Sequence, residues 1–129
     1  MDTNAGGPDN ARMTDVPGID PEVPPSGTGC VECLAGDGPG WWLNLRRCAQ
    51  CGHIGCCDSS PSQHASRHAR DEGHAIITSF EPGEEWFYSF DLEGAVDGAS
   101  LAPPLHRPLD QARPGPAGKV PPDWEAQLN

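Results

Sequence analysis

The spacing of cysteine and histidine is the feature that most constrains how this chain can fold. All six cysteines and four of the five histidines lie in one segment: Cys30, Cys33, Cys48, Cys51, Cys56, Cys57, His53, His64, His68 and His74. Residues 30–97 are the predicted folding unit, and a unit of about 70 residues has a marginal hydrophobic core. Chains of this size commonly need disulfides or a metal to fold. We therefore expect these side chains to stabilise the fold.

Metal binding is favoured over disulfide formation. The N-terminal sequence MDTNAGGPDNARM has no basic start followed by an apolar run, so no secretory signal is visible. No stretch reaches the length of a transmembrane helix. These observations predict a cytoplasmic location, where thiols stay reduced and this cysteine spacing is typical of a metal site.

Composition separates the folding unit from its flanks. Twelve of the 15 prolines lie near the two ends, beside glycines in runs such as GGP and ARPGPAG, so we expect disordered tails at 1–29 and 98–129. The tryptophan in VPPDWEAQLN leaves open a docking motif or a segment that folds back on the domain. The net charge of −11 argues against binding nucleic acid through its phosphates.

Two Cys-x2-Cys pairs and three histidines have the spacing of zinc ligands. Cys30 and Cys33 form one pair, and Cys48 and Cys51 form the other, each the tight knuckle that zinc prefers. The segment 62–72 reads as a helix that starts near a proline and ends at a glycine. Its two histidines, in the spacing H-x3-H, share one face, and a third histidine follows the glycine.

With one of Cys56 or Cys57, these side chains supply eight ligands, enough for two closed tetrahedral sites. Two alternatives remain at this point. In the first, a single zinc binds and some histidines only pack. In the second, a Cys-x2-Cys pair is a dithiol redox centre, although the βαβ context of such motifs is absent. Closed sites leave no open position for water, so we expect structural rather than catalytic zinc.

The ordered series C-x2-C, WLNL, C-x2-C-G-x3-C, H-x3-H-x5-H and FYSFD resembles the ubiquitin-specific-protease-type (UBP-type, or BUZ) zinc finger, including its short stand-alone bacterial members. The resemblance runs from Cys30 to about Val96 and implies an α+β fold with two interlocked zinc sites. It assigns one zinc to Cys30, Cys33, Cys56 and His64, and the other to Cys48, Cys51, His68 and His74. It leaves Cys57 as a partly buried thiol or a spare ligand, and His53 as a residue of the turn or one that contacts a ligand without binding the metal.

Two segments alternate like strands, and with a further strand they predict a small antiparallel sheet on which the helix packs. In WWLNLR, one face carries Trp41, Leu43 and Leu45, expected in the core, and the other carries Trp42, Asn44 and Arg46, expected at the surface. The segment AIITSF is a second strand. In EWFYSFD, the third strand, one face carries Trp86, Tyr88 and Phe90.

The resemblance implies a pocket lined by Trp42, Tyr88 and Phe90, which in ubiquitin-binding members receives the C-terminal Gly-Gly of ubiquitin. Those members follow the third cysteine with Gly-Arg, and the arginine binds the terminal carboxylate. This chain has Cys57-Asp58 there, so the charge is reversed and we do not expect ubiquitin to bind in the usual mode.

Two hypotheses describe how the pocket could bind a ligand without that arginine. In the first, Arg46 supplies the guanidinium and the pocket binds a C-terminal carboxylate. In the second, the aromatic side chains form a cation-binding cage with nearby acidic residues, which are Asp58, Glu84, Glu85, Asp91 and Glu93. Either way, the sequence predicts a non-catalytic protein- or peptide-binding module. The alternatives are a purely structural zinc module and a thiol enzyme or redox sensor that uses Cys57, which lacks a basic neighbour.

Overall fold

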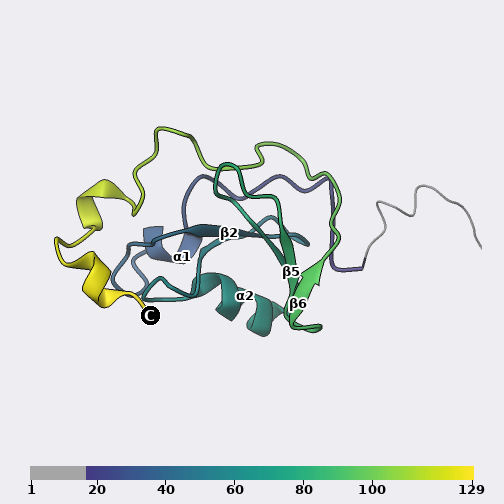
Figure 1. Ribbon diagram of the computed structural model, residues 1–129, viewed down its shortest axis with the longest axis horizontal. Coiled ribbons are helices and arrows are strands. Elements are labelled where there is room, and N and C mark those ends of the chain that lie inside the picture. Colours follow the sequence, from purple (N-terminus) through teal and green to yellow (C-terminus); the bar gives the residue numbers. More distant parts are fainter. Residues whose placement is uncertain (1–16) are drawn as a thin grey trace, which may run out of the picture.

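The computed structural model describes residues 17–129, and its elements form a five-stranded antiparallel sheet with one helix of more than two turns (Figure 1). The strands are β2 (Leu45–Cys48), β3 (Ile54–Cys56), β4 (Ile76–Ser79), β5 (Phe87–Ser89) and β6 (Gly94–Val96). The helices are α1 (Val31–Leu34), α2 (His64–Glu72) and the 3-10 turns η3 (Ala117–Lys119) and η4 (Trp124–Gln127). The sheet order is β3-β2-β4-β5-β6. The predicted α+β fold is confirmed.

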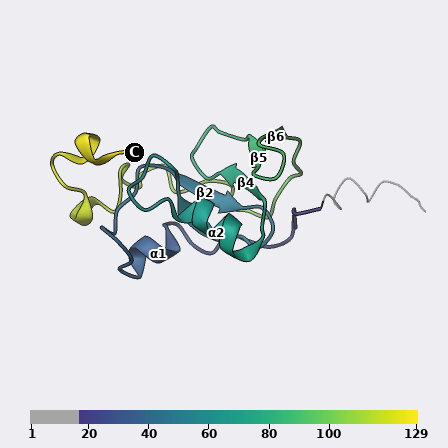
Figure 2. The same ribbon diagram turned by 90° about the horizontal axis from the view of Figure 1, so that it is seen from below.

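Helix α2 lies across one face of the sheet (Figure 2). It ends at Gly73, as its sequence predicts, because this residue adopts a left-handed conformation with φ 72° that suits glycine. Its buried face consists of Ala65 and Ala69 beside the first histidine. Small residues on both sides of the contact let helix and sheet approach closely: a Cβ placed on Gly55 of β3 would lie only 2.7 Å from the backbone nitrogen of Ala65.

The strand register divides the sheet into two faces. Partner positions point to the same side of a sheet, and neighbours along a strand point to opposite sides. Ile77, Tyr88 and Ala95 are partners, and they lie on the face that α2 covers. Thr78, Phe87 and Val96 are also partners, and they lie on the opposite face with Arg47.

The opposite face is apolar and is covered by the two flanking segments. Ile19 from the N-terminal side and Leu101 from the C-terminal side form a second core cluster with Ala49 and Ile76. Phe87, Val96, Ala75 and Ala99 pack against this cluster. In Figure 1 the N-terminal flanking segment and the first part of the C-terminal one (green) run along the side of the sheet opposite α2.

Buried polar contacts hold these segments in place. Arg47 is 1% exposed, and its guanidinium donates hydrogen bonds to the carbonyl oxygens of Val23, Ala102 and Pro104 at 2.9, 2.8 and 3.0 Å. Further along the chain, Arg107 Nε lies 2.7 Å from a carboxylate oxygen of the buried Glu81.

The expectation of disordered tails is therefore wrong for most of the flanking sequence. Residues 17–29 and 98–129 are placed against the domain, because the second face of the sheet needs an apolar cover and the buried arginines need acceptors. The first part of the expected N-terminal tail, residues 1–16, lies outside the described residues.

The strand expected at WWLNLR begins later than its alternation suggests. The observed strand β2 starts at Leu45, so the two tryptophans precede it and strict alternation does not apply to them. Trp41 and Trp42 are both buried, at 1% and 2% exposure. The backbone of Trp42 pairs in both directions with Gly115, at 2.8 and 3.0 Å. The expected surface position of Trp42 is therefore wrong, because the C-terminal segment covers it.

Candidate functional site

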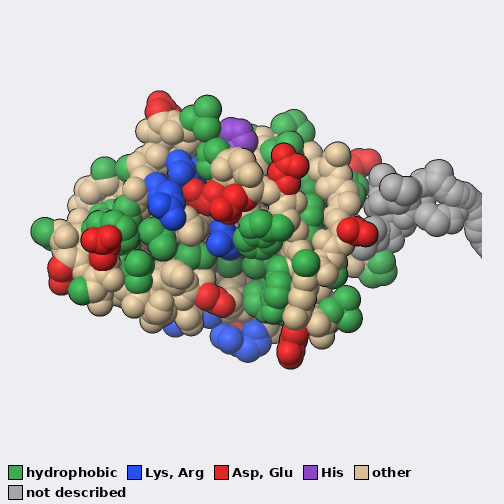
Figure 3. Space-filling view, viewed as in Figure 1, with side chains coloured by type: hydrophobic (Ala, Val, Ile, Leu, Met, Phe, Trp, Pro, Cys, Tyr) green, Lys and Arg blue, Asp and Glu red, His purple; other side chains and the backbone are tan. Residues whose placement is uncertain are grey.

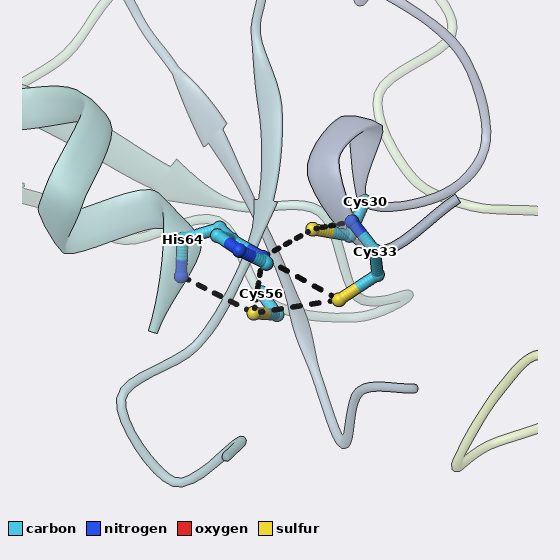
Figure 4. A group of neighbouring side chains, drawn as sticks. All are labelled: Cys30, Cys33, Cys56 and His64. Atoms are coloured by element: carbon cyan, nitrogen blue, oxygen red, sulfur yellow. Dashed lines mark hydrogen bonds between the residues drawn. The ribbon is translucent and has the colours of Figure 1, made fainter. Parts of the chain in front are cut away.

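Four side chains from three parts of the chain meet at the first zinc quartet, which consists of Cys30, Cys33, Cys56 and His64 (Figure 4). The first two flank the start of α1, the third ends β3, and the histidine begins α2. His64 Nδ1 lies 3.3, 3.4 and 3.5 Å from the three sulfur atoms, in chain order. Two of the sulfur atoms, those of Cys33 and Cys56, are 4.0 Å apart.

These distances are those of a tetrahedron around zinc. With Zn–S bonds of about 2.3 Å and a Zn–N bond of about 2.0 Å, neighbouring ligand atoms lie about 3.5 Å (N to S) and 3.8 Å (S to S) apart. All four ligands of the first quartet are buried. The arrangement therefore fits a closed structural zinc site with three thiolates and one imidazole.

The second zinc quartet consists of Cys48, Cys51, His68 and His74. Cys48 ends β2 and Cys51 lies in the turn that follows, while His68 lies on α2 and His74 just beyond it. Two sulfur–nitrogen distances, Cys51 Sγ to His68 Nε2 and Cys48 Sγ to His74 Nδ1, are 3.3 and 3.5 Å. Helix α2 thus supplies one ligand to each quartet, which ties the N-terminal knuckle to the sheet.

Electrostatics favour a cation at both quartets. Hydrogen bonds shared with Cys30 and Cys56 raise the pKa of the Cys33 thiol. Hydrogen bonds from Cys30 and Cys33 lower the pKa of Cys56 to about 2. Burial raises the pKa of Cys48 to about 11. A divalent ion is needed to hold all of these sulfurs as thiolates, the form that binds zinc.

Outer contacts orient the histidine ligands. His64 Nε2 lies 3.2 Å from Asp37 Oδ2, which matches the carboxylate–histidine–zinc arrangement. The ring of His53 stacks on that of His68 with 3.9 Å between centroids, and its Nε2 lies 2.8 Å from Glu32 Oε2. His53 belongs to neither quartet. The pKa of His68 is lowered, mainly because the ring is partly buried. The lowered pKa favours the neutral imidazole that a metal requires.

The family model described as "Zn-finger in ubiquitin-hydrolases and other protein" matches residues 30–100. The chain belongs to this family. The solution NMR structure of a protein from Rhodopseudomonas palustris is similar to this UBP-type finger, with 39% sequence identity and a TM-score of 0.57. The match covers 81% of this chain and 94% of the other. The predicted UBP-type finger is confirmed, and each of its two quartets can hold a zinc ion.

The structure also brings together most of the predicted ligand-binding residues. A cavity of about 480 Å³, here called the aromatic pocket, lies between α2 and β5. Its lining includes Arg46, Asp58, Trp86, Tyr88 and Phe90, together with apolar side chains of the sheet and helix. Trp42, expected in this pocket, is buried in the core instead, and Trp86 contributes the indole ring. The alternation in EWFYSFD places Trp86 on the same face as Tyr88 and Phe90, and this pattern is the sequence signal that Trp86 lines the pocket with them.

One cation is fixed inside the aromatic pocket. The guanidinium carbon of Arg46 lies 4.8 Å from the centroid of the Trp86 ring, a cation–π contact. Its Nη1 lies 3.3 Å from Ser79 Oγ and 3.8 Å from a carboxylate oxygen of Glu84. The Arg46 side chain is 16% exposed, so the charge is held at the wall of the cavity rather than in bulk water.

Asp58 occupies the position where ubiquitin-binding members carry arginine. Its carboxylate accepts a hydrogen bond from the Ser66 hydroxyl on α2, and its carbonyl oxygen accepts one from Gln63 Nε2 at 3.0 Å. Asp58 therefore fastens the loop before α2 to the start of that helix. The loop follows directly on Cys56, so zinc binding also positions this wall of the aromatic pocket.

Cys57, the spare thiol, also lines the aromatic pocket but is only 5% exposed. Its sulfur lies 3.4 Å from Ser60 Oγ. The first quartet contains Cys56 and not this residue.

Within residues 17–129, no helix combines the length and apolar character needed to cross a bilayer.

Proposed function

We propose that this UBP-type finger is a non-catalytic peptide-binding module whose aromatic pocket binds a carboxylate of its ligand through Arg46. The observation that carries the proposal is the position of this guanidinium, which shares a cavity with Trp86, Tyr88 and Phe90. A carboxylate placed there gains charge-assisted hydrogen bonds, and the rings bury the neighbouring part of the peptide. A free C-terminus is the carboxylate that every peptide carries.

The pocket suits an anion better than a cation. The face of Trp86 already holds the Arg46 guanidinium, so a cationic ligand would have to compete for it. Asp58 is engaged by Ser66, and Glu84 is 48% exposed, where water screens its charge. These contacts support the carboxylate hypothesis over the cation cage.

The zinc ions have a structural role in this proposal. Each quartet contains four protein ligands and so leaves no position for a reacting water. A cytoplasmic location accompanies the proposal, because thiolate ligands persist in a reducing compartment. Ubiquitin in the usual mode and nucleic acid are not the proposed ligands, since Asp58 replaces the family arginine and the net charge is −11.

The test is an NMR titration of the zinc-loaded chain with short peptides that have free C-termini, compared with the same peptides amidated at the C-terminus. We expect shifts at Arg46 Nε and at the Trp86 indole, and at least a tenfold loss of affinity on amidation or in Arg46→Ala, the usual effect of losing a hydrogen bond between charged groups. Arg70→Ala is the matched control, because this arginine is 69% exposed on α2 and lines no part of the pocket.

Two results contradict the proposal. If amidated peptides bind as well as or better than the free acids, the cation cage is correct. If no peptide shifts the pocket resonances, the finger is a purely structural zinc module.

A further inference from the structure

A second hollow lies on the opposite face of the sheet from α2. Its volume is about 540 Å³. Its wall is formed by sheet residues Thr78, Phe87 and Val96 and by the segment 97–101 that follows β6. Segment 97–101 lies largely beyond the predicted finger, whose boundary was residue 97. We call this hollow the acidic pocket, for the two carboxylates described below.

The floor of the acidic pocket is apolar. Phe87, Val96 and Leu101 line it and belong to the second core cluster or pack against it. Gly98 lets the segment 97–101 lie directly against the Phe87 ring, since a Cβ at this position would collide with that ring. Leu105, which is 55% exposed, adds apolar surface at the edge.

The polar lining is predominantly negative. Glu85 and Asp97 line the pocket and are both exposed. Among residues 17–129, neither takes part in an ion pair. Arg47 also contributes to the wall, but its guanidinium donates to three backbone carbonyls, so this described cation is not directed at the carboxylates of the rim. On the face shown in Figure 3, acidic side chains likewise lie among hydrophobic ones.

The acidic and aromatic pockets adjoin. Trp86 and Phe87, at the start of β5, line both of them. Ser79 of the acidic pocket also lies 3.3 Å from Arg46 in the aromatic pocket. A single extended peptide can therefore occupy both by passing over Trp86, which is 40% exposed.

We propose that the acidic pocket binds a lysine or arginine side chain of the peptide whose carboxylate occupies the aromatic pocket. This inference rests on the proposed function and adds the chemical class of the ligand: a basic peptide. The aliphatic stem of the side chain packs on Phe87, Val96 and Leu101 while its charged end meets Glu85 and Asp97. The net charge of −11 also favours encounter with a basic partner.

The test uses short glycine–serine peptides with a free C-terminus and one lysine at successive positions upstream of it. Matched peptides carry norleucine, which keeps the stem and removes the charge. In NMR titrations of the zinc-loaded chain, we expect lysine at one position to bind about two- to fivefold more tightly than norleucine at low salt, the range for partly exposed ion pairs. This preference should shift the Asp97 and Gly98 amides and shrink at high salt.

The double variant Glu85→Gln, Asp97→Asn should lose the lysine preference and keep its affinity for the norleucine peptide. The double variant Glu93→Gln, Glu125→Gln is the control, since it also removes two negative charges, from exposed glutamates that line neither pocket. Equal affinity for lysine and norleucine peptides in the wild-type chain, or a preference that survives in the Glu85→Gln, Asp97→Asn variant, overturns the inference.

The result also separates the two proposals. If the norleucine peptide binds in an Arg46-dependent manner without any lysine preference, only the acidic-pocket inference fails. If neither peptide binds, the proposed function fails and this inference fails with it.

Discussion

Gly55→Ala is the substitution that most directly tests how helix and sheet build the first zinc quartet. A Cβ at this position would lie 2.7 Å from the backbone nitrogen of Ala65 and 2.9 Å from its Cα. These are backbone atoms of α2, which cannot rotate away. To restore an ordinary contact of about 3.4 Å, the start of the helix must move by roughly 0.7 Å.

This movement of the helix displaces two zinc ligands relative to each other, because Gly55 precedes Cys56 and Ala65 follows His64. Metal–ligand distances tolerate about 0.2 Å, so the first quartet cannot keep its geometry unchanged. Overpacking of a well-packed contact costs about 1–3 kcal/mol. The entropy that alanine removes from the unfolded chain offsets about 0.4–1 kcal/mol of this. We expect a net loss of about 1–2 kcal/mol and a decrease in Tm of roughly 5 to 10 °C.

The assay combines thermal unfolding of the zinc-loaded protein with a titration of the metal-free protein with Co²⁺. The first quartet offers three sulfurs and the second offers two, so their sulfur-to-cobalt absorption differs and the two sites can be followed separately. We expect Gly55→Ala to weaken the three-sulfur site about tenfold or more.

Gly94→Ala on β6 is the matched control, since the nearest atom to its added Cβ is 3.9 Å away and its φ lies outside the left-handed region. If the Gly55 and Gly94 variants have the same Tm and the same Co²⁺ titration, the close contact between α2 and β3 does not control the zinc site.

Three further predictions concern the metal, a flanking segment and the spare thiol. Complete chelation of zinc should unfold the domain, because structural zinc sites contribute about 10 kcal/mol or more, comparable to the whole stability of a domain this size; an unchanged far-ultraviolet circular dichroism spectrum would contradict this. Arg47→Ala should lower the stability by about 2–4 kcal/mol and release the segment after residue 98 to limited proteolysis, since it leaves three carbonyls without their donor; Arg70→Ala should leave the digestion pattern unchanged. Cys57 should resist iodoacetamide at neutral pH in the zinc-loaded protein, as it is 5% exposed; stoichiometric labelling of this residue would restore the thiol-sensor alternative.

Metal ligation could be predicted from the sequence because it depends on local spacing. Two Cys-x2-Cys knuckles and histidines four apart on a helix specify their geometry within a few residues. The pairing of ligands between the two quartets depends on how α2 crosses the sheet. Spacing alone left that pairing open, and the family resemblance supplied it.

The flanking segments and the position of Trp42 could not be predicted in this way. Proline and glycine content describes how a segment behaves alone, whereas residues 99–104 are held by the apolar sheet face and by Arg47. Trp42 was expected at the surface from a strand period that begins only at Leu45. Its burial depends on Gly115, more than 70 residues further along the chain. Long-range contacts of this kind leave no local pattern.

Helix α2 carries one ligand of each metal site on successive turns, His64 and His68. Release of either ion therefore frees one end of a nine-residue helix, which is too short to persist without its anchors. We expect the loss of one ion to weaken, without abolishing, the binding of the other, so that metal affinity at one end of the finger depends on occupancy at the other.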